Sequence, residues 1–274
     1  MRCFQAVLAA SVLGVVAALA GVFSLDAQAQ SSEPPIPESA PATQPATQPA
    51  EGFPQGCRVD VERGVVELDA EVVLTEGWLE TLACAPQTKE HESILRIGTT
   101  PSVVHRALLA VGATPGQPLR VVQRDDGMLD IEPPTGQRVR VELIRLVDGV
   151  EVVTPANQWV LNRLTDRPLA DPYWVFAGSE VRDVLGETVY MADREGATIS
   201  LVSFGSDVLA RPTRQTDANA DHDQAWVVHT DRVPPAGTAV VVRLTPVGPR
   251  AAATQTVTQP ATQPAEPVGA TPGP

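Results

Sequence analysis

The chain has 274 residues and a formal net charge of −13 at pH 7. This acidic balance argues against a nucleic-acid ligand, because electrostatic binding to phosphates needs a basic stripe. Aromatic residues make up 4% of the chain, which is low for a base-stacking platform, whereas 43% hydrophobic residues are enough for the core of a soluble domain.

The N-terminus has the features of a targeting segment. Arg2 is followed by an uncharged apolar run over residues 6–25, and Ala27 and Ala29 are small residues at a suitable cleavage site. We expect residues 1–29 to be a signal peptide, with an uncleaved anchor as the alternative because the run is long enough to span a bilayer. Either interpretation predicts a secreted, periplasmic or envelope protein. Contact with a membrane is expected only through an uncleaved segment.

Two flanks rich in Pro, Ala, Thr and Gln enclose the rest of the chain. The tetrapeptide Ala-Thr-Gln-Pro occurs twice over residues 42–49, and nearly the same repeat returns over residues 257–264. Such segments have few large apolar groups to bury, so we expect residues 30–56 and 248–274 to be disordered. A single globular domain is then predicted over residues 57–247.

Apolar alternation and turn residues predict mostly strands within this domain. The clearest helix covers about 101–111, with Thr100 as its N-cap and Pro101 in its first turn. Thr154-Pro155 could begin a second, short helix over about 155–161. Asp125-Asp126-Gly127 and Asp148-Gly149 mark hairpin turns. We therefore predict an α+β fold that is mainly β, with an antiparallel or mixed sheet. The expected strands cover 58–75, 78–83, 93–97, 119–123, 137–147, 173–176, 188–191, 199–202, 226–229 and 239–242.

The most concentrated polar cluster is Lys89, Glu90, His91, Glu92 and Ser93, and Lys89 is the only lysine of the chain. In an extended conformation Lys89, His91 and Ser93 would share one face, and the two glutamates the other. The cluster could be a ligand or catalytic site, with His91 as proton carrier or metal ligand and Lys89 as anion binder. It could equally be a polar network that pins the strand entry to the helix.

His105, on the predicted helix, is the second histidine of interest. It could approach His91 to make a two-histidine metal site, or it could be a hydrogen-bonded histidine of the helix surface. Both are weak metal candidates. A third is the loop with Asp217, Asn219, Asp221 and Asp223, whose spacing resembles a calcium loop. His222 replaces the turn glycine there, so a solvated acidic loop is expected. No metal or other cofactor is predicted.

Cys57 and Cys84 are the cysteines left if the signal segment is removed. An even pair in an oxidising compartment predicts a disulfide, with free buried thiols or a redox pair as alternatives.

The run over residues 88–95, followed by residues 104–109 and 112–116, resembles the YdjY-type domain of bacterial envelope proteins. Residues 174–179, 190–193 and 199–202 fit the same pattern, and Lys-Glu-His-Glu-Ser over 89–93 is its most specific part. The resemblance implies an exported module but lends no activity.

The leading hypothesis is a non-catalytic binding or scaffolding module of the envelope, whose partner is an unidentified envelope protein or ligand. Gly-x-Ser-x-Gly, phosphate-binding glycine loops, His-Glu-x-x-His and Cys-x-x-Cys do not occur in the sequence. The first alternative is an envelope enzyme or metal-binding protein centred on Lys89, Glu90, His91 and Glu92. The second is a thiol redox protein.

Overall fold

The computed structural model describes residues 52–216 and 226–249. This part of the chain is built mainly from strands, which confirms the α+β, mainly β class predicted from the sequence. The strands are β1 (Cys57–Asp60), β2 (Val65–Val72), β3 (Thr81–Cys84), β4 (Ser93–Ile97), β5 (Arg120–Gln123), β6 (Leu129–Glu132), β7 (Arg138–Val147), β8 (Val150–Pro155), β9 (Val160–Asn162), β10 (Arg167–Pro168), β11 (Tyr173–Phe176), β12 (Val181–Val184), β13 (Glu187–Tyr190), β14 (Ala197–Ser200), β15 (Leu209–Ala210), β16 (Trp226–Val228) and β17 (Ala239–Pro246).

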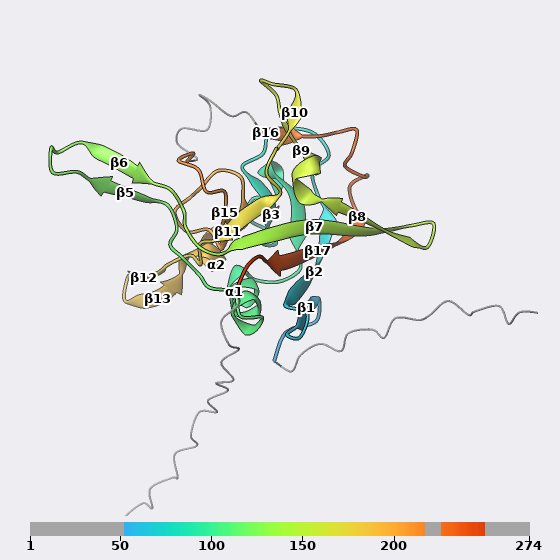
Figure 1. The fold of residues 1–274 in the computed structure, drawn as a ribbon, viewed down its shortest axis with the longest axis horizontal. Helices are drawn as coiled ribbons and strands as arrows, with labels where there is room; N and C mark the ends of the chain where they lie inside the picture. The colour runs from blue at the N-terminus through green and yellow to red at the C-terminus, as the bar shows by residue number, and fades with distance from the viewer. Residues whose placement is uncertain (1–51, 217–225, 250–274) are drawn as a thin grey trace, which may run out of the picture. The chain divides into compact units, whose positions relative to one another are not determined.

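The largest sheet closes on itself (Figure 1). β2 pairs with β17 on one side and with β1 and β4 on the other, and β17 also pairs with β7. From β7 the ring continues through β11, β15, β14, β3 and β4 back to β2. The pairs β3–β4 and β14–β15 are parallel, so the sheet is mixed. An early strand and the last strand of the domain therefore lie side by side.

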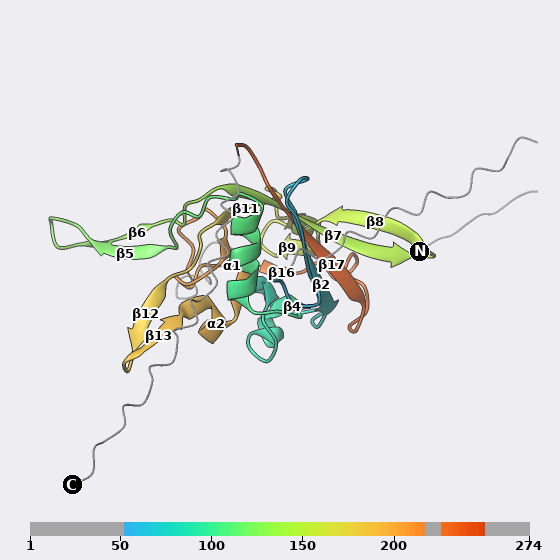
Figure 2. The same ribbon diagram turned by 90° about the horizontal axis from the view of Figure 1, so that it is seen from below.

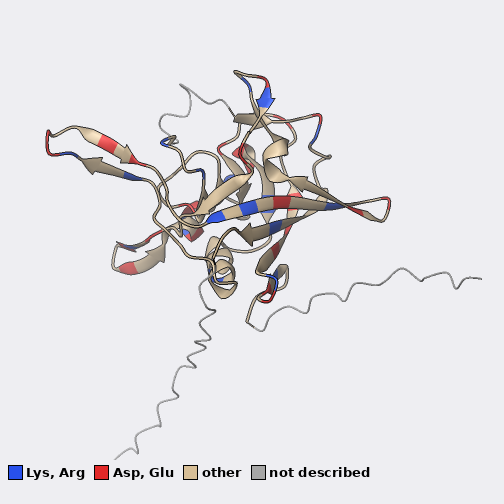
Figure 3. Ribbon diagram, in the orientation of Figure 1, with Lys and Arg blue, Asp and Glu red and all other residues tan. Residues whose placement is uncertain are grey.

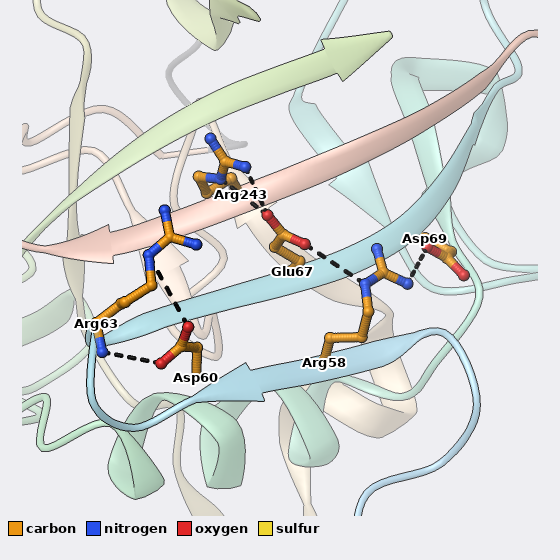
Figure 4. A network of polar contacts seen from close by, with 6 residues as sticks. All are labelled: Arg58, Asp60, Arg63, Glu67, Asp69 and Arg243. Atoms are coloured by element: carbon orange, nitrogen blue, oxygen red, sulfur yellow. Dashed lines mark hydrogen bonds and ion pairs between the residues drawn. The ribbon is translucent and has the colours of Figure 1, made fainter. Parts of the chain in front are cut away.

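Neighbouring strands β1, β2 and β17 carry a network of charged side chains on the outer face of this sheet (Figure 4). On β2, Leu68 is buried whereas Glu67 and Asp69 point outward, as strand alternation requires. Glu67 lies 3.5 Å from Arg58 and 2.7 Å from Arg243, and Arg58 bonds Asp69 at 2.7 Å. Opposite charges directly across neighbouring strands favour this register over a shifted one.

The predicted helix over 101–111 is confirmed as α1 (Pro101–Ala110). Thr100 begins it but makes no side-chain cap. The N–H of Ser102 is instead bound at 2.7 Å by Asp193, which lies 91 residues away on α2 (Met191–Glu195). The sequence analysis missed α2 and extended the strand at 188–191 into it. The short helix expected over 155–161 is one 3-10 turn, η2 (Ala156–Trp159).

The core lies inside the closed sheet and beneath α1, which packs against β1, β14 and α2. Burial of a large apolar side chain stabilises the fold by about 1.5–3 kcal/mol, so the core supplies most of the driving force. The largest fully buried side chains are Leu68, Leu82, Ile94, Leu95, Ile97, Leu108, Leu143, Trp159, Trp174, Phe176, Ile199 and Leu201.

Four hairpins project beyond the closed sheet, and we call them the projecting hairpins: β5–β6, β7–β8, β9–β10 and β12–β13. In both views β5–β6 and β12–β13 extend on one side and β7–β8 on the opposite side (Figures 1 and 2). The predicted turn Asp148-Gly149 is confirmed, and both of its residues have a positive φ, of 51° and 80°. This is the signature of the type I′ turn that two-residue hairpins prefer.

Several predicted segments lie outside the described residues. They are the signal segment 1–29, most of the 30–56 linker and of the 248–274 tail, and the loop with Asp217, Asn219, Asp221 and Asp223. Within 52–216 and 226–249, no helix has the length and apolar character that a membrane span requires.

Candidate functional site

Lys89 lies at the centre of a partly buried ion-pair cluster. Its Nζ is 3.0 Å from Glu92 and 3.8 Å from Glu80, and it lies 3.9 Å from the centre of the Phe204 ring. The lysine side chain is only 21% exposed. Two carboxylates and an aromatic face already surround this ammonium, so the geometry does not favour the anion-binding role considered for it. We call Lys89, Glu80, Glu92 and Phe204 the Lys89 cluster.

The shared face predicted for Lys89, His91 and Ser93 is wrong. Residues Glu90–Glu92 form a 3-10 turn, η1, in which the N–H of Glu92 donates to the carbonyl of Lys89 at 3.1 Å. Residues three apart eclipse in a 3-10 turn, whereas in a strand they would point to opposite faces. The Lys89–Glu92 pair therefore needs this turn. His91 lies 3.7 Å from the other oxygen of the Glu92 carboxylate, so Lys89 and His91 both contact Glu92.

The other predicted members of the cluster also have local partners. Glu90 lies 3.4 Å from Arg96, which links η1 to β4. Ser93 is buried, and its hydroxyl donates to the carbonyl of Leu95 at 2.9 Å. His91 is 78% exposed on the surface of the turn. Of the five residues over 89–93, His91 is the one that solvent reaches most freely.

His105 has a hydrogen-bond partner within the fold, as one of its two interpretations expected. Its Nδ1 lies 2.8 Å from the hydroxyl of Tyr190, which donates to the carbonyl of Gly178 at 3.1 Å. Because the single phenolic proton is used there, Nδ1 must carry the proton of the His105 contact. Burial lowers the pKa of His105, and Phe176 packs edge-on against its ring. The neighbours of His105 are thus Tyr190 and Phe176, whereas His91 lies beside Glu92.

The structure offers no support for a metal site in the part of the chain that it describes. No group of three or more His, Cys, Asp or Glu side chains there is arranged to hold an ion. The calcium-like loop over residues 217–223 lies outside the described residues and stays a prediction.

Cys57 and Cys84 are both buried with free thiols, so the predicted disulfide is not formed. Cys57 on β1 lies opposite Leu68 of β2. Cys84 on β3 lies opposite Arg96 of β4, and Arg96 lies opposite Glu71 of β2. Because β1 and β4 pair with the same side of β2, Cys84 is one strand farther from β2 than Cys57 and three residues along it. One strand spacing and three residues of rise separate the two Cα atoms by roughly 11 Å, beyond the limit of about 7 Å for a disulfide.

The environment of the two thiols also speaks against redox chemistry. Burial raises the pKa of both cysteines, and that of Cys57 to about 11. Because the thiolate is the reactive form, these thiols are poor nucleophiles.

A second polar region, which the sequence analysis missed, is the loop Ser203–Asp207 between β14 and β15. Asp207 is fully buried, and its carboxylate accepts hydrogen bonds from the Ser203 hydroxyl and from the N–H of Phe204. Burial away from water raises the pKa of Asp207 to about 6, and the hydrogen bonds from hydroxyl and amide groups offset part of this rise. The Ser206 hydroxyl of the same loop bonds Glu195 at the end of α2. These hydrogen bonds hold the loop residues on both sides of Phe204, and they therefore fix the position of Phe204.

A groove with a volume of about 640 Å³ shares Phe204 with the pocket that Lys89 lines. Residues 117–122 line it without interruption, and 120–122 of them belong to β5. A strand that presented only one face would contribute alternate residues, so β5 faces the groove with its edge. Glu180, which precedes β12, and Arg182 of β12 line it as well. The remaining lining residues are Ser203, Phe204, Gly205 and Thr216.

Among residues 52–216 and 226–249, no strand pairs with the edge of β5 that faces away from β6. The N–H of Arg124 donates to the carbonyl of Met128 at 2.8 Å, which makes these two residues a hydrogen-bonded pair. Such pairs alternate along an antiparallel ladder, so Val121 and Gln123 direct their N–H and C=O groups away from β6. In the described part of the chain β5 pairs with β6 alone. Val121, which lines the groove, is 59% exposed.

The charged side chains along the groove are paired with each other. Arg120 lies 2.9 Å from Glu132 across the β5–β6 hairpin, and Arg182 of β12 pairs with Glu180, which precedes that strand. The groove therefore offers a ligand backbone hydrogen bonds and apolar contacts more than an unmatched charge.

Taken together, the fold and the groove define a mainly β domain with a closed sheet and a projecting hairpin, β5–β6, whose β5 edge is paired with no strand of the described residues. The profile of the YdjY domain matches residues 57–245, and the chain belongs to this family. This confirms the resemblance read from residues 88–95 and the later motifs. Comparison with curated proteins and with solved structures gave no match.

Proposed function

We propose that the chain is an exported binding or scaffolding module of the cell envelope, and that its groove holds an extended polypeptide segment of a partner protein. The observation that carries the proposal is the outward-facing backbone of β5 at Val121, which lines the groove, and at Gln123, which ends the same strand. A strand laid there would continue the β5–β6 sheet, which is a common way for a domain to bind an extended peptide. The signal segment predicted over residues 1–29 supports the location.

The chemistry of the groove favours a polypeptide bound through its backbone. Its ion pairs are satisfied internally, so they select weakly for a charged ligand. Val121 and Phe204 provide apolar surface that a bound strand would cover. An unpaired strand edge can pair with the strands of other chains unless a partner covers it. Because β5 is short, such unspecific pairing is limited. The ligand class is therefore an extended peptide with apolar side chains.

The redox alternative gains no support from the geometry, and the enzyme alternative has only a pocket of about 570 Å³ that Lys89, His91 and Glu92 help to line. An enzyme centred on the 89–92 cluster would need an available Lys89, and this residue is matched by Glu80 and Glu92. A redox function would need an accessible pair of reactive thiols, and Cys57 and Cys84 are buried and far apart.

The test uses a displayed library of random peptides, selected on the full chain, followed by fluorescence anisotropy with the selected peptide. Val121→Pro removes the outward N–H from the groove edge of β5, at an edge position where proline is tolerated. We expect its affinity to fall about tenfold, the effect of a lost hydrogen bond of about 1.4 kcal/mol.

Leu129→Pro is the matched control. Leu129 lies opposite Gln123, so its N–H also points outward, but from the far edge of the same hairpin. This variant should bind the peptide as the wild type does. Equal loss of affinity in both variants, or a library that yields no peptide competing at the groove, would refute strand addition at β5.

A further inference from the structure

A surface on a different sheet carries a row of apolar side chains. Trp78 pairs with Val227 of β16, Val227 with Leu161 of β9, and Leu161 with Pro168 of β10. Residues directly opposite across strands point to the same face, so these four side chains form one row, which we call the Trp78 row. Trp226, next to Val227, points to the other face and is buried.

The row is open to solvent at one end and continues to a hairpin turn. Trp78 is 56% exposed, and Leu164 in the β9–β10 turn is 66% exposed. The guanidinium of Arg163 lies 5.2 Å from the centre of the Trp78 ring, so the turn and the row are in contact. An exposed indole, an exposed leucine and a cation thus lie together.

The charge of the β9–β10 turn sets it apart from the other projecting hairpins. Counting the loop and one flanking residue on each side, Arg163 and Arg167 outweigh Asp166 and give +1. The same count gives −1 at β5–β6, from Arg124, Asp125 and Asp126; −1 at β7–β8, from Asp148; and −1 at β12–β13, from Glu187. Figure 3 shows the basic colour on β10 and the acidic colour at the turns of β5–β6 and β7–β8.

We propose that the Trp78 row and the β9–β10 turn form a docking face for an anionic lipid surface. Trp78 and Leu164 enter the headgroup region, and Arg163 and Arg167 contact the lipid phosphates. Tryptophan is preferred at the interface between lipid and water, and basic residues near an anionic leaflet add to the attraction. The two arginines of the turn, in a chain that is strongly acidic as a whole, favour an anionic lipid as the partner of this face, and the exposed Glu76 near Trp78 opposes this attraction.

This inference does not depend on the groove. The residues of the row and the turn are separate from those that line the groove, so either proposal can fail alone. A face of this size gives reversible binding on its own, since one short apolar insertion is a marginal anchor. It would hold the domain flat on a surface that another segment of the chain, or a partner, brings within reach.

Tryptophan fluorescence of the full chain tests the proposal. Trp159, Trp174 and Trp226 are at most 8% exposed, so a shift of emission on adding vesicles reports on Trp78. We expect a blue shift with phosphatidylglycerol vesicles and none with phosphatidylcholine vesicles. Fluorescence is preferred to sedimentation because the apolar run over residues 6–25 could bring the full chain to either vesicle.

Two variants and one control locate the effect. Leu164→Asp should abolish the shift, and Arg167→Glu should raise the lipid concentration needed for it about tenfold or more. Leu185→Asp changes an equally apolar, fully exposed residue at the β12–β13 turn and should leave the shift intact. No shift with phosphatidylglycerol, or equal loss in Leu185→Asp, overturns the proposal. A shift caused by lipid-free soluble envelope protein instead of vesicles assigns the face to a protein partner and also overturns it.

Discussion

The Lys89 cluster and the Ser203–Asp207 loop share Phe204, but they place their charged side chains in opposite environments. In the cluster, Lys89 is matched by Glu80 and Glu92. In the loop, Asp207 is buried among hydroxyl and amide groups, and its pKa rises to about 6. Matched charges of the first kind hold segments together, whereas a buried carboxylate of the second kind costs stability at neutral pH. The region that carries this cost is the one that borders the groove.

The largest effect is expected where the two regions are joined. Gly196 ends α2 with a φ of 76°, and a Cβ there would lie 2.1 Å from the Thr88 hydroxyl, next to Lys89. Gly196→Ala combines a left-handed backbone penalty of about 1–2 kcal/mol with overpacking of about 1–3 kcal/mol. We expect the free energy of unfolding in urea to fall by about 4 kcal/mol.

Gly186→Ala separates the two causes. Gly186 has a similar φ of 87° at the β12–β13 turn, but a Cβ there would meet no atom within 4 Å. Gly186→Ala should lower the free energy of unfolding by the backbone penalty alone, about 1–2 kcal/mol. If both variants lose the same stability, the contact between Gly196 and Thr88 does not join the two regions.

A change of nearly the same size is expected at Asp207, and it depends on pH. The folded carboxyl has a pKa of about 6, against about 3.9 in an unfolded chain. The folded state therefore binds the proton more tightly. This stabilisation is fully present below about pH 4 and is lost as the pH rises through about 6, in total about 3 kcal/mol.

Asp207→Asn removes this titration and retains an acceptor for the Ser203 hydroxyl and the Phe204 N–H. The stability of the variant relative to the wild type should rise by about 3 kcal/mol between pH 4 and pH 7.5. The measurement is urea unfolding of both proteins across this range, and the difference cancels the other titrating groups. A difference that does not change with pH would mean that Asp207 titrates as an ordinary, solvated carboxyl.

The smallest effect concerns the matched cluster. Lys89→Met leaves Glu80 and Glu92 without their cation, and the site is partly buried, so the loss should lie between that of an exposed and a buried pair, about 2 kcal/mol. His91→Ala should change stability by less than about 0.5 kcal/mol, because His91 is mostly exposed. Thermal and urea unfolding of both variants measure this contrast. An unchanged or raised stability of Lys89→Met would return the cluster to the candidate sites.

Local sequence rules predicted the parts of the fold that local interactions determine. The helix over 101–111, the Asp148-Gly149 turn and the strand over 137–147 follow from periodicity and turn chemistry, and all three are present. Thr100 is the N-cap residue, as predicted, but its side chain makes no cap bond, and the acceptor for the Ser102 N–H comes from Asp193, 91 residues away. The extended geometry expected over 89–93 failed because the Lys89–Glu92 pair favours a turn.

The groove could not be predicted because its parts are distant in sequence. Residues 117–122, residues 203–205 and β12 come together only once the sheet has closed. Asp207 gave no warning, since a single acidic residue after Gly205-Ser206 is typical of a solvent-exposed loop. The predicted disulfide was wrong for a related reason. It was inferred from an oxidising compartment, which says nothing about the strand positions that keep Cys57 and Cys84 apart.

The pairing of β2 with β17 has a consequence for how the protein is made. Val66 on β2 lies opposite Leu244 on β17, so this contact spans nearly the whole domain, and β17 also supplies the neighbour that β7 needs. In a nascent chain that has been synthesised only as far as β16, the edges of β2 and β7 that pair with β17 would be unpaired. Much of the core would also be exposed. Such high contact order slows folding. The domain should therefore acquire its native state only after synthesis has passed residue 246, and a truncation before β17 should yield an aggregating chain rather than a smaller domain.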